Sequence, residues 1–352
     1  MLSRLRLPTL LCIFIAAAFS LVACDPLAPD PTTVVVIVTP TDTPLPTLIV
    51  QPTASFTPSV TPTATLTPTP RPTNTPNPTI TATATPSLTP TVCTDTVGQI
   101  VDLRFKSAIA KLNVPYRVYL PPCYSQTGKR YPLAILMHGS DRDETEWTDL
   151  LDVNGKLERG LALGALPPMI LVMPYGGELA NSNSEFGVRE TWEDVVVDEL
   201  MPEVERNFCT WNDRAGRAIG GISRGGFWAF EIGLRHPDLF SAIGGHSAFF
   251  DEDHIAKKYA ATYNPLFLME TLTLPARLQP RIYLDVGADD YALNPIEEFH
   301  DKLVEHKIDA DFVLNSTGEH NIDYWKSHVT EYLSFYGQTW PRNVSELPSC
   351  LS

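Results

Sequence analysis

The sequence has little positive charge, and this shortage limits the partners that it can take. It holds 26 lysine and arginine residues against 41 aspartate and glutamate residues, which gives a net charge of −15 at pH 7. A surface that binds nucleic acid or anionic lipid needs the opposite balance. We therefore expect neither nucleic acid nor an anionic membrane surface to be a direct partner.

Cysteine is also scarce, and its spacing argues against the common metal sites. None of the six cysteines lies in a Cys-x-x-Cys pair, and no glycine-rich phosphate loop is present. Three acidic residues, Asp141, Asp143 and Glu144, are better explained as a solvated helix start than as a Ca²⁺ site. The sequence thus predicts an activity without a metal or another cofactor.

The long apolar run at the N-terminus has the features of an export signal. Residues 10–22 follow an arginine-containing start, and the run is too short to span a membrane comfortably. Its end, Leu-Val-Ala-Cys at residues 21–24, resembles the lipobox of bacterial lipoproteins. We predict a lipoprotein signal peptide over residues 1–23 and lipidation of Cys24; a plain signal peptide and an uncleaved anchor are the alternatives.

Charge is almost absent from residues 38–92, in which threonine and proline dominate. Such a composition cannot build a core, and proline favours the extended polyproline II conformation. We predict a disordered Thr/Pro-rich linker over residues 24–92. At ~3.1 Å per residue, its proline-rich part of about 55 residues reaches about 170 Å at most. Residues 93–352 remain for one globular domain.

The most informative motif is Gly-x-Ser-x-Gly, centred on Ser223. It follows a short apolar strand and precedes an apolar helix, which is the context of a nucleophile elbow. Downstream, Asp290 follows a predicted strand at residues 281–286, and His320 follows another at residues 310–314. The order Ser, Asp, His, with each residue placed after a strand, is that of the α/β-hydrolases.

Each residue of such a triad has its own task. Ser223 is a weak nucleophile until a base removes its proton, and we assign that role to His320. Asp290 would hold the imidazole in the productive tautomer. The neighbouring Asp289 is an alternative acid, but the spacing after the strand favours Asp290. Asp285 lies within the strand itself.

Acyl transfer also needs an oxyanion hole, which two backbone N–H groups can form. One donor should be the N–H of Arg224, directly after the nucleophile. The second should come from the loop after the apolar strand at residues 133–137, and we predict the N–H of Ser140. His138, at the start of that loop, is expected to orient it.

The other histidines lack this context. His246 follows a strand and is expected to line the site without acting as the base. His236 is expected at the end of a helix. The remaining ones are expected on the surface: His254, His300, His306 and His328.

Strands alternate with helical patterns along residues 93–352, which implies a mostly parallel sheet with helices on both faces. Residues 97–105 and 114–120 alternate apolar and polar side chains, and we expect them to form an antiparallel pair at the sheet edge. Residues 190–208 predict a helix that Pro202 kinks.

Between residues 97 and 337, the chain resembles the esterase D family of α/β-hydrolases. That family includes feruloyl and acetyl-xylan esterases, S-formylglutathione hydrolase, enterochelin esterases and antigen 85-type mycolyltransferases. It commonly has Met at the position of Arg224. The resemblance rests on five segments: Tyr-Leu-Pro-Pro at residues 119–122, Leu-Met-His-Gly at 136–139, Val-Met-Pro-Tyr-Gly at 172–176, Gly-Ile-Ser-Arg-Gly-Gly at 221–226 and Gly-Glu-His at 318–320.

The resemblance implies a serine esterase that works through an acyl-enzyme on an ester substrate such as an acylated polysaccharide. Two alternatives are an acyltransferase that acts on sugar or glycolipid hydroxyls and a non-catalytic hydrolase fold that binds carbohydrate or cell wall. With the predicted lipobox, it implies an extracytoplasmic protein that meets the bacterial membrane only through its N-terminal lipid.

Four cysteines belong to the globular domain, namely Cys93, Cys123, Cys209 and Cys350. An even number in an exported protein predicts disulfide bonds. Four cysteines allow three pairings, and the sequence does not choose among them. A bridge between Cys93 and Cys350 is attractive because these residues flank the domain.

Overall fold

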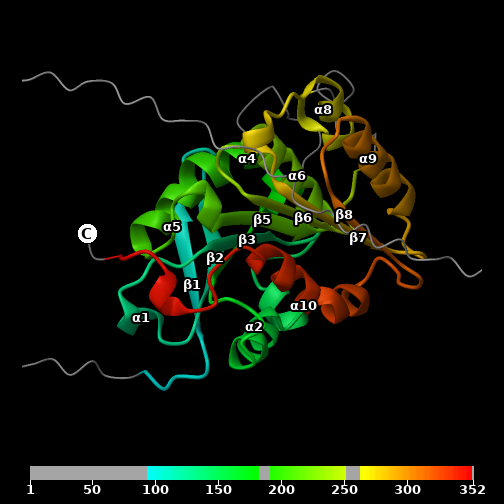
Figure 1. The fold of residues 1–352 in the computed structure, drawn as a ribbon. Coiled ribbons are helices and arrows are strands. Elements are labelled where there is room, and N and C mark those ends of the chain that lie inside the picture. The colour runs from blue at the N-terminus through cyan, green and yellow to red at the C-terminus, as the bar shows by residue number, and fades with distance from the viewer. Residues whose placement is uncertain (1–92, 182–190, 251–261, 351–352) are drawn as a thin grey trace, which may run out of the picture. The chain divides into compact units, whose positions relative to one another are not determined.

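A twisted sheet runs through the part of the chain that this computed structural model describes, residues 93–181, 191–250 and 262–350 (Figure 1). It has eight strands in the order β1-β2-β4-β3-β5-β6-β7-β8. The strands are β1 (Gln99–Lys106), β2 (Asn113–Leu120), β3 (Leu133–Met137), β4 (Ile170–Pro174), β5 (Arg217–Ile222), β6 (Ala242–His246), β7 (Arg281–Gly287) and β8 (Asp311–Asn315).

The strand pairing confirms the predicted fold class. β1 pairs antiparallel with β2 at the sheet edge, and β2 pairs antiparallel with β4. All pairs from β4 through β8 are parallel. Every residue of β3, β4 and β5 is buried, as expected for parallel strands that are covered on both faces.

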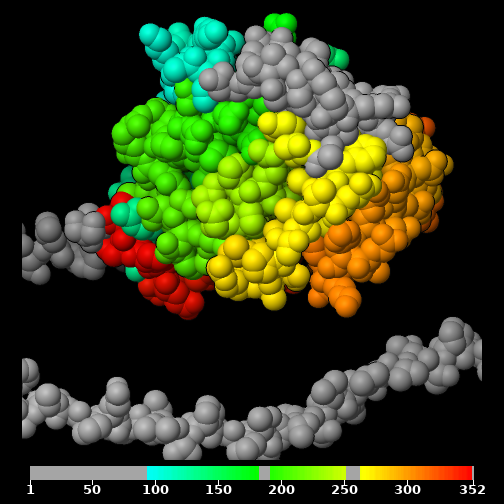
Figure 2. Space-filling view, turned by 90° about the horizontal axis from the view of Figure 1, so that it is seen from above, coloured from blue at the N-terminus to red at the C-terminus, as the bar shows by residue number. Residues whose placement is uncertain are grey.

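Helices pack on both faces of the sheet (Figure 1). One face carries α4 (Trp192–Asp194), α5 (Met201–Asn207), α6 (Arg224–Arg235), α8 (Pro265–Thr271) and α9 (Leu293–Glu305); the other carries α2 (Val153–Ala162) and α10 (Ile322–Gly337). The short helices α1 (Tyr124–Thr127) and α3 (Gly177–Asn181) follow β2 and β4. Figure 2 shows the green segments around α6 beside the yellow segment of α8 and the orange segment of α9.

The helix predicted over residues 190–208 is divided into three consecutive segments. Between α4 and α5 lies the π-helical segment η2 (Val195–Leu200). Pro202 stands in the first turn of α5. Proline cannot donate a backbone hydrogen bond and its ring crowds the preceding turn, so a wider turn before it is the expected response. Residue 190 lies outside the described ranges.

Two disulfides join the four domain cysteines, and neither of them is the Cys93–Cys350 bridge that the chain ends made attractive. Cys93 pairs with Cys123, 30 residues along the chain, and Cys209 pairs with Cys350, 141 residues along the chain. The presence of disulfides is thus confirmed, and the pairing differs from the one that the chain ends suggested.

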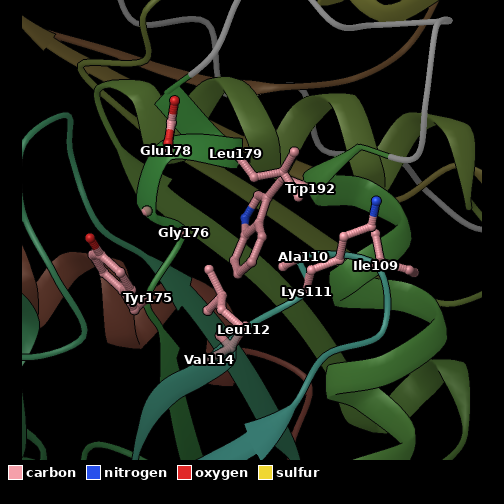
Figure 3. Close-up of a pocket in the computed structure, with 11 residues that line it drawn as sticks. Ile109, Ala110, Lys111, Leu112, Val114, Tyr175, Gly176, Glu178, Leu179 and Trp192 are labelled. Carbon is pink, nitrogen blue, oxygen red and sulfur yellow. The ribbon is translucent and has the colours of Figure 1, made fainter.

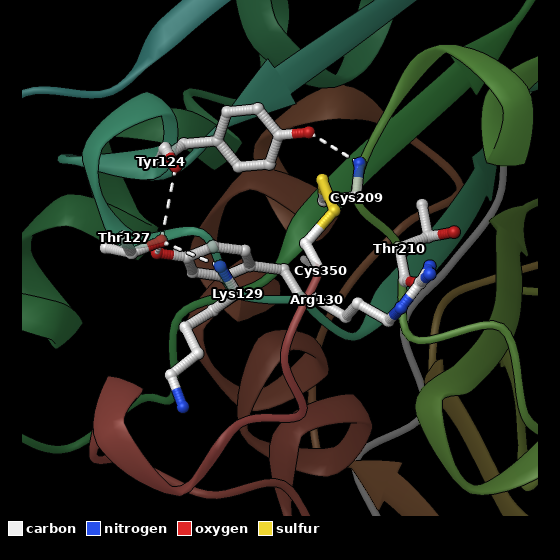
Figure 4. The surroundings of a disulfide bond; sticks show 8 residues. Tyr124, Thr127, Lys129, Arg130, Cys209, Thr210 and Cys350 are labelled. Carbon is white, nitrogen blue, oxygen red and sulfur yellow. Dashed lines mark hydrogen bonds between the residues drawn. A yellow bond between two sulfur atoms is a disulfide. The ribbon is translucent and has the colours of Figure 1, made fainter. Parts of the chain in front are cut away.

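The backbone around the second disulfide explains this pairing (Figure 4). The N–H of Cys350 donates to Gly128 O at 2.8 Å, so the C-terminal segment lies beside the segment before β3. Tyr131, in that segment, donates its N–H to Cys209 O at 2.8 Å. The hydroxyl oxygen of Tyr124 accepts the N–H of Cys209 at 2.7 Å. Three distant segments therefore meet at this bridge.

Among the described residues, no helix has the length and apolar character that a membrane span requires. The predicted signal peptide at residues 1–23, the predicted lipidation site Cys24 and the predicted linker at residues 24–92 lie outside the described ranges, as does His254.

Candidate active site

Ser223 stands on the sharp turn between β5 and α6. Its φ of 54° and ψ of −117° lie outside the conformations that L-residues commonly adopt. A side chain at Gly221 would overlap the backbone of Gly225, and one at Gly225 would overlap the backbone of Met137 at the end of β3. The two glycines of the motif therefore allow the strand–turn–helix geometry of a nucleophile elbow.

Three side chains from three strand ends form one hydrogen-bonded chain. His320 Nε2 lies 2.8 Å from Ser223 Oγ, and His320 Nδ1 lies 2.9 and 3.0 Å from the two carboxylate oxygens of Asp290. Asp289, the alternative acid, instead accepts the N–H of Gly318 at 3.3 Å and braces the loop that carries His320. The structure brings together the three residues selected from the chain order.

The surroundings of Asp290 favour its ionised form. Burial raises the pKa of Asp290, but hydrogen bonds from His320 and from the backbone N–H of Ala292 outweigh burial and hold the pKa below its usual value. The carboxylate is therefore charged at neutral pH. A charged carboxylate at Nδ1 fixes the imidazole and stabilises the imidazolium ion.

The loop after β3 presents two backbone N–H groups with different uses. Gly139 donates its N–H to Glu146 Oε2 at 2.8 Å. Among the described residues, the N–H of Ser140 makes no hydrogen bond, and Ser140 lines the Ser223 pocket. The N–H of Ser140 is therefore available as a candidate oxyanion donor. The role of Glu146 in holding this loop was not predicted from the sequence. The only signal for it is an acidic residue directly before the apolar Trp147.

His138 connects this loop to the segment after β4. Its Nδ1 lies 2.7 Å from Gly139 O, and its Nε2 accepts the N–H of Gly176 at 2.9 Å. Burial lowers the pKa of His138, so the neutral ring donates through Nδ1. These contacts are those of a residue that holds a loop.

Arg224 follows the nucleophile, but its side chain does not line the Ser223 pocket. Its Nε donates to Ala180 O at 2.7 Å, and its guanidinium carbon lies 4.9 Å from the centre of the Phe227 ring. Burial lowers the pKa of Arg224 to about 9, which leaves the side chain charged at neutral pH. The charged side chain therefore lies in the protein interior. The backbone N–H of Arg224 lies at the start of α6, directly after the nucleophile.

The pocket above Ser223 has a volume of about 540 Å³, and its lining combines aromatic side chains with polar and charged ones. The ring of Tyr291 lies 4.3 Å from that of His320, and the ring of Trp325 meets the imidazole edge-on at 5.0 Å. Phe249 also lines the pocket. Tyr291 is 67% exposed, so it presents a flat apolar surface to a bound molecule.

A second pocket, of about 570 Å³, lies between the β1–β2 turn and the segment after β4 (Figure 3). Leu112, Tyr175 and Trp192 line it, and Lys111 and Glu178 add charges of opposite sign. Among the described residues, it shares no lining residue with the Ser223 pocket. The hydrogen-bonded chain thus belongs to the first pocket.

Comparison with protein families places the chain. The sequence model of the family described as "Putative esterase" matches residues 107–338. The chain belongs to this esterase family. The Xylanibacter ruminicola protein named endo-1,4-beta-xylanase/feruloyl esterase is 34% identical over 160 residues, which cover 42% of this chain and 21% of that protein.

Other esterase-family relatives agree. Esterase Rv1288 of Mycobacterium tuberculosis is 34% identical over 148 residues, 41% of this chain and 31% of its own length. The match thus spans at most about a third of these curated relatives. A solved ferulic acid esterase has a TM-score of 0.62 and 25% identity over 69% of this chain and 98% of its own.

The fold of the esterase-family domain is also that of a Staphylococcus aureus S-formylglutathione hydrolase. That structure has a TM-score of 0.57 at 18% identity, and the match covers 68% of this chain and 98% of the hydrolase. The described domain therefore has the α/β-hydrolase fold.

Proposed function

We propose that the protein is a serine carboxylic-ester hydrolase that works through an acyl-enzyme. The observation that carries this proposal is the continuous hydrogen-bonded chain from Ser223 through His320 to Asp290, of which Ser223 and His320 line the pocket. His320 takes the proton from Ser223 Oγ as that oxygen bonds to the ester carbonyl carbon. Asp290 stabilises the imidazolium that forms.

The remaining steps use the same groups. The N–H groups of Ser140 and Arg224 stabilise the oxyanion of the tetrahedral intermediate. When the intermediate collapses, the C–O bond to the alcohol breaks and the alcohol leaves with the proton from His320. Water then gives a proton to His320 and attacks the acyl carbon. The acid is released, and Ser223 regains its proton. This chemistry requires no cofactor.

For the substrate, we propose an acylated carbohydrate with an aromatic or short acyl group. The flat side chains of Phe249, Tyr291 and Trp325 in the pocket support an aromatic acyl group. Relatives named feruloyl and ferulic acid esterase support the same class. Acyl transfer to a sugar or glycolipid hydroxyl differs only in the group that accepts the acyl chain.

Turnover assays test this function directly. Purified full-length protein and the Ser223→Ala variant would be assayed on p-nitrophenyl esters of graded chain length, then on acetylated and feruloylated xylan. We expect release of acid by the wild type and not by the variant. Formation of an acylated sugar in the presence of a sugar acceptor would identify a transferase. Binding to xylan without turnover would identify a binding protein.

We further propose that a lipid on Cys24 anchors the enzyme outside the cytoplasm. The lipobox-like residues 21–24 and the two disulfides support export. Full-length protein is expected to partition into detergent, and Cys24→Ser is expected to abolish this behaviour. A mature N-terminus that mass spectrometry shows to be unmodified would contradict the proposal.

A further inference from the structure

A second Asp–His pair lies in the core, and its side chains do not line the Ser223 pocket. His246 ends β6 and faces Asp285 on β7, where the strand register pairs the two residues directly. His246 Nδ1 lies 2.7 Å from Asp285 Oδ1, and both side chains are fully buried. The expectation that His246 lines the active site is wrong, since it is not among the pocket residues.

Tyrosines of α10 complete the polar contacts of this pair. Tyr324 and Tyr332 each donate a hydroxyl hydrogen to Asp285 Oδ2 at 2.9 Å, and the Tyr336 hydroxyl lies 2.8 Å from His246 Nε2. Burial raises the pKa of all three tyrosines and lowers that of His246, so the hydroxyls keep their protons and the ring is neutral. A buried network with all contacts satisfied is rigid.

The sheet makes room for this network. Gly220 on β5 and Gly244 on β6 are direct neighbours in the sheet. A side chain at either position would overlap the hydroxyl of Tyr336. Because neither glycine has a side chain, the hydroxyl of Tyr336 can pack against the sheet and reach His246.

The network touches both sides of the Ser–His hydrogen bond. On the nucleophile side, His246 O accepts the N–H of Ser223 at 3.0 Å. On the base side, Asn315 Nδ2 donates to the Tyr324 hydroxyl at 2.9 Å. Asn315 ends β8 and Tyr324 lies in the first turn of α10. This bond therefore closes the base of the loop that carries His320.

We propose that Tyr324, anchored on Asp285, is a positioning residue that fixes His320 relative to Ser223. This inference rests on the proposed function, because it assumes that Ser223 and His320 carry out the proton transfer. A displacement of about 1 Å in a reacting group can cost ~100-fold in rate. Tyr332 gives Asp285 the same type of bond from two turns further along α10, away from the His320 loop.

Tyr324→Phe and Tyr332→Phe form a matched pair, since each removes one hydroxyl donor from the same oxygen of Asp285. We expect similar losses of Tm. Tyr324→Phe should lower kcat by about 10- to 100-fold with KM within about twofold, whereas Tyr332→Phe should lower kcat by less than about threefold. The rate of Ser223 labelling by a small fluorophosphonate should fall in parallel with kcat.

Asn315→Ala removes the partner of Tyr324 on the other side of the loop. We expect it to lower kcat in the same direction as Tyr324→Phe but less strongly, with little effect on Tm because Asn315 is only half-buried. If Tyr324→Phe does not fold, Asn315→Ala carries the test, and an unchanged kcat then overturns the proposal.

Equal losses of kcat in the two tyrosine variants, or an unchanged kcat in Tyr324→Phe, would overturn the positioning role. Ser223→Ala, measured alongside, separates this failure from a failure of the proposed function. An active Ser223→Ala overturns the proposed function itself. If Ser223→Ala is inactive and the two tyrosine variants lose kcat equally, only the role of Tyr324 is overturned.

Discussion

The molecule contains two Asp–His pairs with similar geometry and different surroundings. In the pair at the pocket, His320 Nδ1 lies 2.9 Å from Asp290 Oδ1, and His320 Nε2 is hydrogen-bonded to the hydroxyl of Ser223. In the pair in the core, His246 Nδ1 lies 2.7 Å from Asp285 Oδ1, and His246 Nε2 is hydrogen-bonded to the hydroxyl of Tyr336. A carboxylate–imidazole pair is thus not sufficient to define a catalytic site.

The two pairs differ in access and in the freedom to change protonation state. The side chain of His320 is 9% exposed and faces the pocket, so it can exchange a proton with substrate and water. His246 is fully enclosed, and burial lowers its pKa. The pocket pair suits proton transfer, and the core pair suits the holding of strands and helix in place.

Removing the serine at the pocket pair is expected to have the largest effect. Ser223→Ala should lower kcat by ~10⁶, since the acyl-enzyme can no longer form. The measurement is kcat on any ester that the wild type turns over. A loss smaller than tenfold would show that Ser223 is not the nucleophile.

The next largest effect should come from the acid of the pocket pair. Asp290→Asn should lower kcat by up to ~10⁴, because an amide favours the wrong tautomer of the imidazole. Asp289→Asn is the matched control and should be far milder, since its contacts are with the loop backbone. If the ranking of kcat is reversed, the acid is Asp289.

Reduction of the disulfides should weaken the fold and leave both pairs intact. The chain-entropy model gives roughly 3–5 kcal/mol for each bridge, and the 141-residue loop of Cys209–Cys350 should contribute about 1.4 kcal/mol more than the 30-residue loop of Cys93–Cys123. We expect reduction to lower Tm while kcat of the folded enzyme is unchanged. Unreduced, unfolded full-length protein has two cysteines outside the bridges, Cys12 and Cys24, so more than two titratable thiols would contradict the bridges.

In the core pair, the main expected effect is on stability. In the wild type, the Asp285 carboxylate accepts hydrogen bonds from His246, Tyr324 and Tyr332. Asp285→Asn places an amide group against these donors, which should lower the free energy of unfolding by about 1–3 kcal/mol. Its kcat should stay well above that of Asp290→Asn. If both variants lose kcat equally, the core pair takes part in the chemistry more directly than its burial allows.

The smallest expected effect is a pH dependence of stability at Asp290. Its folded-state pKa lies below its ordinary value, so ionised Asp290 contributes stability above the unfolded-state pKa, and this contribution is lost as the pH falls through the folded-state pKa. The unfolding free energy of the wild type, measured in urea between pH 7 and pH 3, should therefore approach that of Asp290→Asn at acid pH. A constant difference would contradict this.

The fold and the close approach of Ser223, Asp290 and His320 could be predicted from the sequence because parallel strands end at one edge of a sheet. Ser223, Asp290 and His320 each follow such a strand, so they meet. His246 is instead the last residue of β6, and its side chain lies on the face that α10 covers, since side chains of a strand alternate between its faces. The disulfide pairing depends on which distant segments lie side by side, and position along the chain does not reveal that.

Whether Ser223 is the reactive nucleophile is tested most directly by labelling the full-length protein with a small fluorophosphonate. Activity would be followed during labelling, and the modified residue would be located by peptide mass spectrometry. We predict one phosphonate per chain on Ser223, with activity falling in step with labelling and no labelling of Ser223→Ala. Full activity after complete modification of Ser223, or inactivation through another residue, would contradict the proposed mechanism.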